Sequence, residues 1–182
     1  MRVRAFEGPP SSPNVVESRV TSPSQARLAN TIVATPRGVI CAFSLYVVAR
    51  EAQSTGPIVG TLAISGASPA SYDVELRLDG ASKGLVIGTG RLNDGGAVPA
   101  SFQPVADLPD ARWQRVRIEL AIGPGGHLNL DVGGTPVLAA TGAPFTDIGA
   151  GSTATLTVGL KPLASAGTWQ VLYDDVVCDH LP

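Results

Sequence analysis

The chain has 182 residues, a length that suits one domain over residues 1–182 with a substantial core. Its formal charge is −2, from 13 basic and 15 acidic residues without a block of either sign, which argues against a nucleic-acid partner. Glycine (21) and proline (15) are frequent and the apolar content is 44%, so the composition predicts many short strands rather than disorder.

Targeting signals are sparse. No apolar run is long enough to span a membrane, so we expect no membrane insertion. The opening MRVRAFEGPP lacks the apolar stretch of a signal peptide, so we expect none in this chain. Lysine occurs only at Lys83 and Lys161, and Ser, Thr, Asn and Gly dominate the polar residues. That composition favours an extracytoplasmic protein that is secreted, on the cell surface or in the envelope.

The N-terminal half of the chain shows strand patterns. Residues 22–32 allow at most a short helical turn, because the prolines around them prevent a longer helix. GVICAFSLYVV (38–48) predicts a strand that is covered on both faces. Strands are then expected at 56–65, 71–80 and 83–92, with a hairpin turn at Asp79-Gly80 between the last two.

The second half is more regular. Residues 93–111 are typical of a loop with room for one edge strand, and GPGG (123–126) predicts a turn between two alternating strands. About ten to twelve strands at hairpin spacing predict a two-sheet antiparallel sandwich or jelly roll. The strands expected in this half cover 112–122, 127–134, 135–142, 153–162 and 168–179.

The order of several short motifs resembles laminin-G-like, concanavalin A-like jelly-roll domains of bacteria. FEG (6–8) and SPSQA (22–26) are similar to the opening motifs of that family. The resemblance implies an all-β, two-sheet antiparallel jelly-roll sandwich, a fold that hosts lectins, adhesion modules, lyases and hydrolases. The motifs that carry it best are WQRVRIEL (113–120), LNLDVGGTPV (128–137), ATLTVGL (154–160) and VLYDDVV (171–177).

Two adjacent carboxylates, Asp174 and Asp175, lie inside the last expected strand. Neighbouring strand residues point to opposite faces, so the pair shares one site only if a bulge intervenes. One interpretation is a metal site for Ca²⁺, which prefers several hard oxygen ligands. The other is structural use of a buried carboxylate, which the absence of an acidic loop of the D-x-D-x-D kind favours.

The strand D73-V-E-L-R-L-D79 places Asp73, Glu75 and Arg77 on one face. Side chains two residues apart lie roughly 6.5–7 Å apart, a spacing that suits paired glycosidase carboxylates. An arginine beside them is expected to lower their pKa and to weaken a general acid. The alternative is a solvated face in which Glu75 and Arg77 pair with the strand around 115–119.

Other catalytic constellations are not evident in the sequence. Neither His127 nor His180 neighbours a nucleophilic serine in a suitable motif, and Cys178 with His180 falls short of a zinc site. Trp113 and Trp169 are candidates for stacking on a sugar ring, but each begins a strand, where packing is the more frequent role.

Cys41 and Cys178 lie on the first long strand and the last one. In the topology of the resembling family these strands are neighbours, which makes the pair a disulfide candidate and implies an oxidising compartment. The alternative is a pair of free, buried thiols that act as small apolar residues.

From these observations we expect a non-enzymatic binding module of a cell-surface or envelope protein that binds a glycan or a partner protein. An alternative is a structural or assembly domain with no small ligand, and a third is a glycan-active hydrolase or lyase of the same fold. No cofactor is expected, apart from the Ca²⁺ hypothesis at Asp174 and Asp175. The ligand-binding candidates are Asp73, Glu75, Arg77, Arg115 and Arg117.

Overall fold

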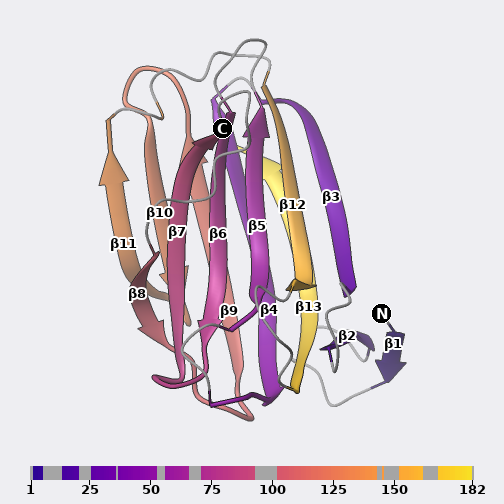
Figure 1. Cartoon of the computed structure of the whole chain (residues 1–182). Helices are drawn as coiled ribbons and strands as arrows, with labels where there is room; N and C mark the ends of the chain where they lie inside the picture. The colour runs from indigo at the N-terminus through magenta and orange to yellow at the C-terminus, as the bar shows by residue number, and fades with distance from the viewer. Residues whose placement is uncertain are drawn as a thin grey trace.

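The computed structural model shows a β-sandwich of two antiparallel sheets that face each other (Figure 1). Within the described residues there is no α-helix, and none of them forms a helix long and apolar enough to cross a membrane. The architecture confirms the predicted all-β, two-sheet jelly-roll sandwich. The structure describes residues 2–5, 14–20, 26–35, 37–52, 56–65, 71–92, 102–142, 145, 152–161 and 168–181.

One sheet has seven strands among the described residues. The last strand of the chain, β13, pairs with β2 on one side and with β4 on the other. A hairpin of β9 and β10 then continues the sheet from β4 to β11. In spatial order the strands are β1 (Arg2–Ala5), β2 (Asn14–Val20), β13 (Trp169–His180), β4 (Gly38–Ala49), β9 (Trp113–Ala121), β10 (His127–Val132) and β11 (Thr135–Thr141).

The other sheet has six strands among the described residues. Its centre is the run of consecutive antiparallel strands β5, β6 and β7, and β12 inserts between β3 and β5. In spatial order the strands are β3 (Ala26–Thr35), β12 (Ser152–Lys161), β5 (Ile58–Ser65), β6 (Ser71–Asp79), β7 (Gly84–Leu92) and β8 (Phe102–Asp107).

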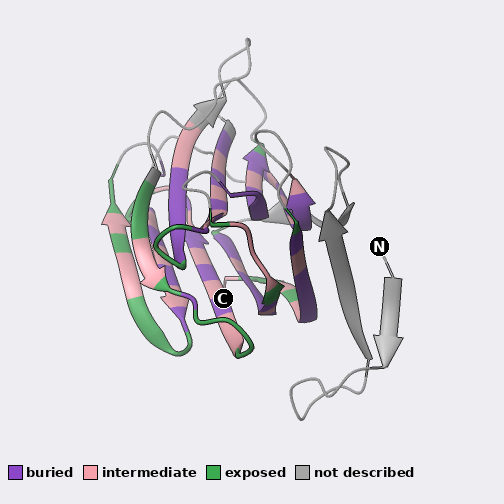
Figure 2. Ribbon diagram, turned by 60° about the horizontal axis from the view of Figure 1, so that its bottom comes forward, coloured by how far each residue is buried: buried purple, intermediate pink, exposed green. Residues whose placement is uncertain are grey.

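The core lies between the two sheets and follows the period of two that strands impose. Figure 2 shows buried residues alternating with partly exposed ones along the central strands. The inward residues are aliphatic or aromatic, so the hydrophobic effect holds the sheets together. They include Phe43 and Leu45 on β4, Leu62 on β5, Val74 and Leu76 on β6, Ile118 on β9, Leu130 on β10, Leu156 on β12 and Tyr173 on β13.

Most of the expected strands are confirmed, but the N-terminal region differs. The helical turn expected in residues 22–32 is wrong, because Ala26–Thr35 forms β3, which pairs along β12. That pairing joins residues more than a hundred positions apart, so the local prolines gave no signal of it. The edge strand expected within 93–111 is β8. The motif FEG (6–8) and residues 22–25 of SPSQA lie outside the described residues.

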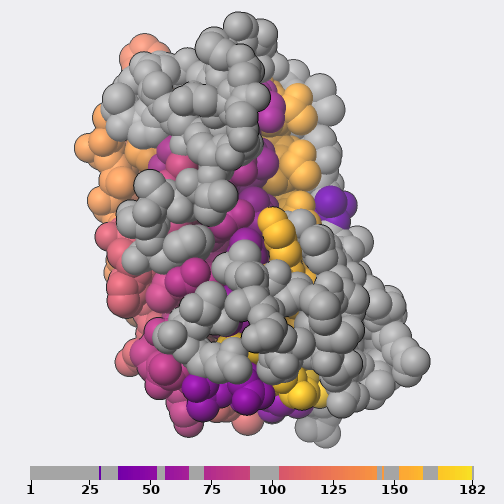
Figure 3. Space-filling model, viewed as in Figure 1, coloured from indigo at the N-terminus to yellow at the C-terminus, as the bar shows by residue number. Residues whose placement is uncertain are grey.

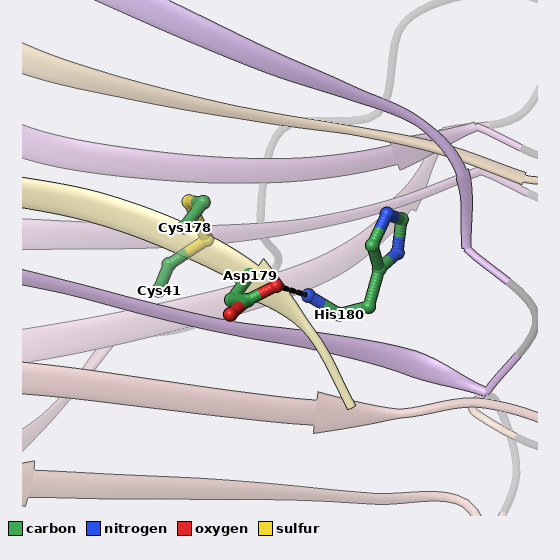
Figure 4. The surroundings of a disulfide bond; sticks show 4 residues. All are labelled: Cys41, Cys178, Asp179 and His180. Atoms are coloured by element: carbon green, nitrogen blue, oxygen red, sulfur yellow. Dashed lines mark hydrogen bonds between the residues drawn. A yellow bond between two sulfur atoms is a disulfide. The ribbon is translucent and has the colours of Figure 1, made fainter. Parts of the chain in front are cut away.

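The disulfide between Cys41 and Cys178 is formed (Figure 4). The two cysteines face each other in the register of β4 and β13, with their Cα atoms 4.1 Å apart. Cys41 is fully buried in the core and Cys178 packs against the core. The bond therefore fastens the last strand of the chain to a central strand of the same sheet, and free thiols are excluded.

Two polar contacts also hold the sandwich together. The Tyr173 hydroxyl donates a hydrogen bond of 3.1 Å across the core to the Val59 carbonyl, which joins the two sheets. At the end of β4, the Arg50 side chain is only 6% exposed; it pairs with Asp110 at 2.6 Å and donates to the Leu108 carbonyl at 2.6 Å. These contacts satisfy polar groups that burial would otherwise penalise.

Candidate active site

The strongest candidate site is the outer face of the six-stranded sheet around β6, which we call the β6 face. Tyr72, Val74, Leu76 and Leu78 of this strand point into the core. The intervening Asp73, Glu75 and Arg77 therefore point outward and remain partly exposed. Strand geometry separates neighbouring members of this row by roughly 7 Å. Figure 3 shows this side of the molecule, where atoms of β5 to β7 and of β12 reach the surface.

The neighbouring strands place only small residues beside the two carboxyl groups. Glu75 lies between Thr61 on β5 and Gly88 on β7. Asp73 lies between Ala63 on β5 and Gly90 on β7 in the next row. These two strands therefore place no bulky side chain directly beside the two carboxyl groups.

Two cations accompany the carboxyl pair. Arg77 on β6 and Lys161 on β12 both pair with Ile58 of β5, so they align across the sheet. The face is also partly shielded from water, because Thr61 and Val86 on it are only 9% and 5% exposed. Charges there interact more strongly than charges on an open surface.

Asp73 has an unusual environment for a carboxyl group. Burial raises its pKa, the negative charge of Glu75 raises the pKa further, and Lys161 opposes the change. Its Oδ1 atom is buried and has no hydrogen-bond partner among the described residues. A carboxyl group that keeps its proton more readily than usual is suited to donate that proton to a substrate.

The expectation that arginine spoils this acid is wrong for Asp73. The charges that act on Asp73 are those of Glu75 and Lys161. Arg77 instead acts on Asp79, at the end of β6. There, burial is outweighed by hydrogen bonds from Ser82 and Ala81 and by the charge of Arg77, so the pKa of Asp79 is lowered.

Arg115 and Arg117, the other ligand-binding candidates, lie on the opposite side of the molecule. They project from β9 on the outer face of the seven-stranded sheet, which we call the β9 face. The five predicted residues therefore do not form one site. The expected pairing of Glu75 and Arg77 with the strand around 115–119 is also wrong, because β6 and β9 belong to different sheets.

The β9 face carries a network of paired charges. Arg117 forms ion pairs with Glu119 and, at 3.1 Å, with Asp131. The Nε2 atom of His127 lies 2.9 Å from Glu119 Oε1, and this hydrogen bond raises the pKa of His127 and lowers that of Glu119. Arg115 donates to the Asp175 carbonyl at 2.9 Å and to Ser44 Oγ at 3.4 Å. Arg117, Glu119, His127 and Asp131 are therefore paired with one another within this network.

Asp174 and Asp175 lie at a bulge of β13 on the same face. The register of β13 against β4 shifts between Asp174 and Val177, and Asp175 has a positive φ of 49°. Asp174 is 8% exposed, burial raises its pKa, and its Oδ1 accepts the Asp175 N–H at 2.8 Å. Within the described part of the chain no group of three or more His, Cys, Asp or Glu residues could hold a metal ion. The calcium hypothesis therefore gains no further ligand there.

Sequence reasoning missed Lys161 and Thr61 as members of the β6 face. Both alternate with inward residues, Leu160 and Leu62, which was visible in the sequence. Their position beside β6 was not, because it depends on the pairing of β12 with β5 and of β5 with β6.

No family model matches the chain and no curated protein matches it. Solved structures do share its fold. Alginate lyase Aly36B aligns with a TM-score of 0.63 and 11% identity, over 92% of this chain and 81% of the lyase. The endo-β-1,4-glucuronan lyase of the fungus Trichoderma reesei aligns with a TM-score of 0.64 and 12% identity, over 99% and 90%. The cellulose-induced protein Cip1 aligns with a TM-score of 0.65 and 11% identity, over 98% and 84%.

These similarities define the class of fold: a concanavalin A-like jelly-roll sandwich of the kind found in polysaccharide lyases. They overturn the prediction of a non-enzymatic binding module, because the alginate lyase and the glucuronan lyase, which share the fold over more than 90% of this chain, are enzymes that act on polysaccharides. The sequence analysis also weighed Asp73 and Glu75 as part of a solvated face, whereas Asp73 is partly buried and its Oδ1 has no hydrogen-bond partner among the described residues.

Proposed function

We propose that the chain is a glycan-active enzyme, a lyase that cleaves an acidic polysaccharide at the β6 face. The observation that carries the proposal is the pairing of two carboxyl groups in different environments on one strand. Burial raises the pKa of Asp73, and Glu75 lies two residues away on the same face. A carboxyl group with a raised pKa suits the role of general acid, and by its position Glu75 is assigned the role of base. The shared fold with an alginate lyase and a glucuronan lyase supports the same class of reaction.

The proposed reaction is β-elimination within a uronate residue. Glu75 removes the proton from the carbon next to the uronate carboxylate, and the electrons of that C–H bond form a carbon–carbon double bond. The bond between the adjacent carbon and the glycosidic oxygen breaks, and Asp73 gives its proton to that oxygen. Positioned acids and bases contribute roughly 10²–10⁴-fold each to such steps.

The cations of the β6 face complete this arrangement. A uronate carboxylate makes the neighbouring C–H bond acidic only when its own negative charge is neutralised. Arg77 and Lys161, aligned across β5, supply that positive charge from one side of the carboxyl pair. Arginine is suited to this role because its planar guanidinium binds a carboxylate through two hydrogen bonds.

The experiment is to incubate the protein with polyglucuronate, alginate and a neutral glucan while following ultraviolet absorbance and reducing ends together. Elimination creates an unsaturated uronate that absorbs, so both signals are expected to rise in proportion on an acidic polymer. Reducing ends without absorbance would show hydrolysis and overturn elimination. No change in absorbance or in reducing ends on any of the polymers would overturn the proposal that the protein is an enzyme.

We further propose that the protein works outside the cytoplasm. The disulfide between Cys41 and Cys178 supports this, since such bonds persist mainly in oxidising compartments. The laminin-G-like subtype of the fold is proposed on the order of its C-terminal motifs alone. Localisation of the natural protein by cell fractionation tests the first point, and recovery in the cytosol with free thiols would contradict it.

A further inference from the structure

The β9 face carries a second feature that the proposed reaction does not use. Tyr46 on β4 and Trp113 on β9 are direct cross-strand neighbours, and their ring centroids lie 5.4 Å apart at an interplanar angle of 55°. Both alternate with inward residues, so both rings lie on the outer side of the seven-stranded sheet. Neither is buried, unlike Trp169, which is 4% exposed.

The surroundings of these rings are apolar on one side and basic on another. Leu172 of β13, 3% exposed, pairs with Tyr46 and lies beside it on the same face of the sheet. Val48, the next outward residue of β4, is 42% exposed; among the described residues Val177 is the other exposed large apolar side chain. We call Tyr46, Val48 and Trp113 the aromatic platform.

One guanidinium group borders the platform. The Arg115 side chain is 41% exposed and lies in the next row of β9, on the same face as Trp113. Hydrogen bonds to the Asp175 carbonyl and to Ser44 hold Arg115 in place. The carboxylate of Asp175 lies 3.8 Å from Arg115, beyond hydrogen-bond distance, so the guanidinium keeps part of its capacity for another acid.

We propose that the aromatic platform is an accessory binding site for an acidic glycan. A sugar ring presents an apolar face that packs on an aromatic ring, and a uronate carboxylate complements the positive charge of Arg115. The indole N–H of Trp113 is buried, so recognition uses the faces of the rings rather than this donor.

The platform and the β6 face lie on opposite outer faces of the sandwich. A glycan held at the platform therefore leaves the β6 face open to another stretch of the same polymer or to a neighbouring chain. Linking two weak sites in one protein raises its overall affinity for a long polymer without new contacts at either site. That role rests on the proposed function, whereas binding at the platform does not.

The chain offers a direct readout, because Trp113 and Trp169 are its only two tryptophans. In a Trp169→Phe variant all tryptophan emission comes from Trp113. Glu75→Gln is added so that the glycan stays intact during the titration. We expect a saturable change in emission with glucuronan oligosaccharides, and a much weaker one with neutral gluco-oligosaccharides. Unchanged emission with every glycan would overturn the proposal.

A second measurement leaves Trp169 in place. In affinity electrophoresis through glucuronan, Trp113→Ala is expected to weaken retardation about tenfold, the amount that one stacked ring supplies. Trp113→Phe should retain most of the retardation, and Arg115→Gln should lower binding to glucuronan but not to a neutral glucan. Retardation of Trp113→Ala equal to that of the parent would contradict the proposal.

The outcomes separate this inference from the proposed enzyme. If no polymer is cleaved but Trp113 still reports glycan binding, the enzyme fails and the platform stands. If cleavage occurs while Trp113→Ala binds and degrades long polymers like the parent, the platform fails and the enzyme stands. If the parent protein forms a dimer and Trp113→Ala is monomeric, the platform is a self-association surface, and that result would overturn the proposal of glycan binding.

Discussion

The charged residues of β9 and those of β6, on the two outer faces of the sandwich, differ in how far they are paired. On the β9 face Arg117, Glu119 and His127 satisfy one another through hydrogen bonds and ion pairs. On the β6 face Asp73 keeps a buried oxygen without a partner among the described residues, beside the like charge of Glu75. Pairing lowers the free energy of the fold, whereas an unpartnered buried carboxyl group raises it. Asp174, at the bulge of β13 on the β9 face, also keeps a buried oxygen without a partner among the described residues. The comparison therefore teaches that incomplete satisfaction alone does not locate a site; at Asp73 it coincides with a second carboxyl group in the same outward row of β6.

The largest effect we expect comes from the disulfide of the seven-stranded sheet. Replacing Cys41 and Cys178 by alanine opens a loop whose ends are 137 residues apart. The entropy of the unfolded chain then rises, which should lower the free energy of unfolding by about 5 kcal/mol. Urea unfolding of the parent and the variant under non-reducing conditions measures this difference in free energy. Activity of the remaining folded protein should persist, because β6 is in the other sheet; its loss without unfolding would show that the two sheets do not act separately.

The next largest effect is a loss of activity, and it compares the two faces through the same glutamate-to-glutamine substitution on each. Glu75→Gln removes the proposed base and should lower the cleavage rate about 10²–10⁴-fold with little change in stability. Its matched control, Glu119→Gln, removes the shared partner of Arg117 and His127 and should leave the rate unchanged. Initial rates and thermal unfolding of both proteins provide the comparison. Equal losses of activity in the two variants would contradict a site confined to the β6 face.

A smaller effect is expected at the contact that joins the sheets. Tyr173→Phe deletes the hydroxyl that donates to the Val59 carbonyl and leaves that carbonyl without its donor inside the core. The free energy of unfolding should fall by about 1–2 kcal/mol. Chemical denaturation measures the change. An unaltered midpoint would mean that the inter-sheet hydrogen bond adds nothing to the stability of the sandwich.

The smallest effect is a pH dependence of stability from His127. Its pKa in the folded protein is raised above the ordinary 6.5, chiefly by the hydrogen bond to Glu119. The protonated His127 therefore stabilises the fold fully below pH 6.5, and this contribution is lost as pH rises through the higher folded-state pKa. Melting temperature measured across this window should decline more in the parent than in His127→Gln. The same pH dependence of the melting temperature in both proteins would show that His127 is not its source.

The sequence was sufficient for the fold class and for the strands from residue 38 onward, but not for the strands at 2–5, 14–20 and 26–35, and it was only partly sufficient for the candidate site. Strict alternation in 113–122 and 127–132 and the order of short motifs identified the strands and the jelly roll. The row of Asp73, Glu75 and Arg77 was also visible, because its members are two residues apart.

The features that the sequence did not reveal depend on contacts between strands that are far apart in the chain. The pairing of β12 with β5 brings Lys161 into the row of Arg77, and no local pattern encodes that pairing. The assignment of β6 and β9 to different sheets separates arginines that look equivalent along the chain. The raised pKa of Asp73 arises from burial in the folded state, so composition alone predicted an ordinary solvated acid.

The most direct test of the account is the mass of the products released from glucuronan. Elimination at the β6 face predicts oligosaccharides that lack one water relative to hydrolysis products, contain no oxygen from heavy-oxygen water and disappear in Asp73→Asn. Products that incorporate heavy oxygen, or that form unchanged in Asp73→Asn, would contradict a lyase acting through Asp73 and Glu75.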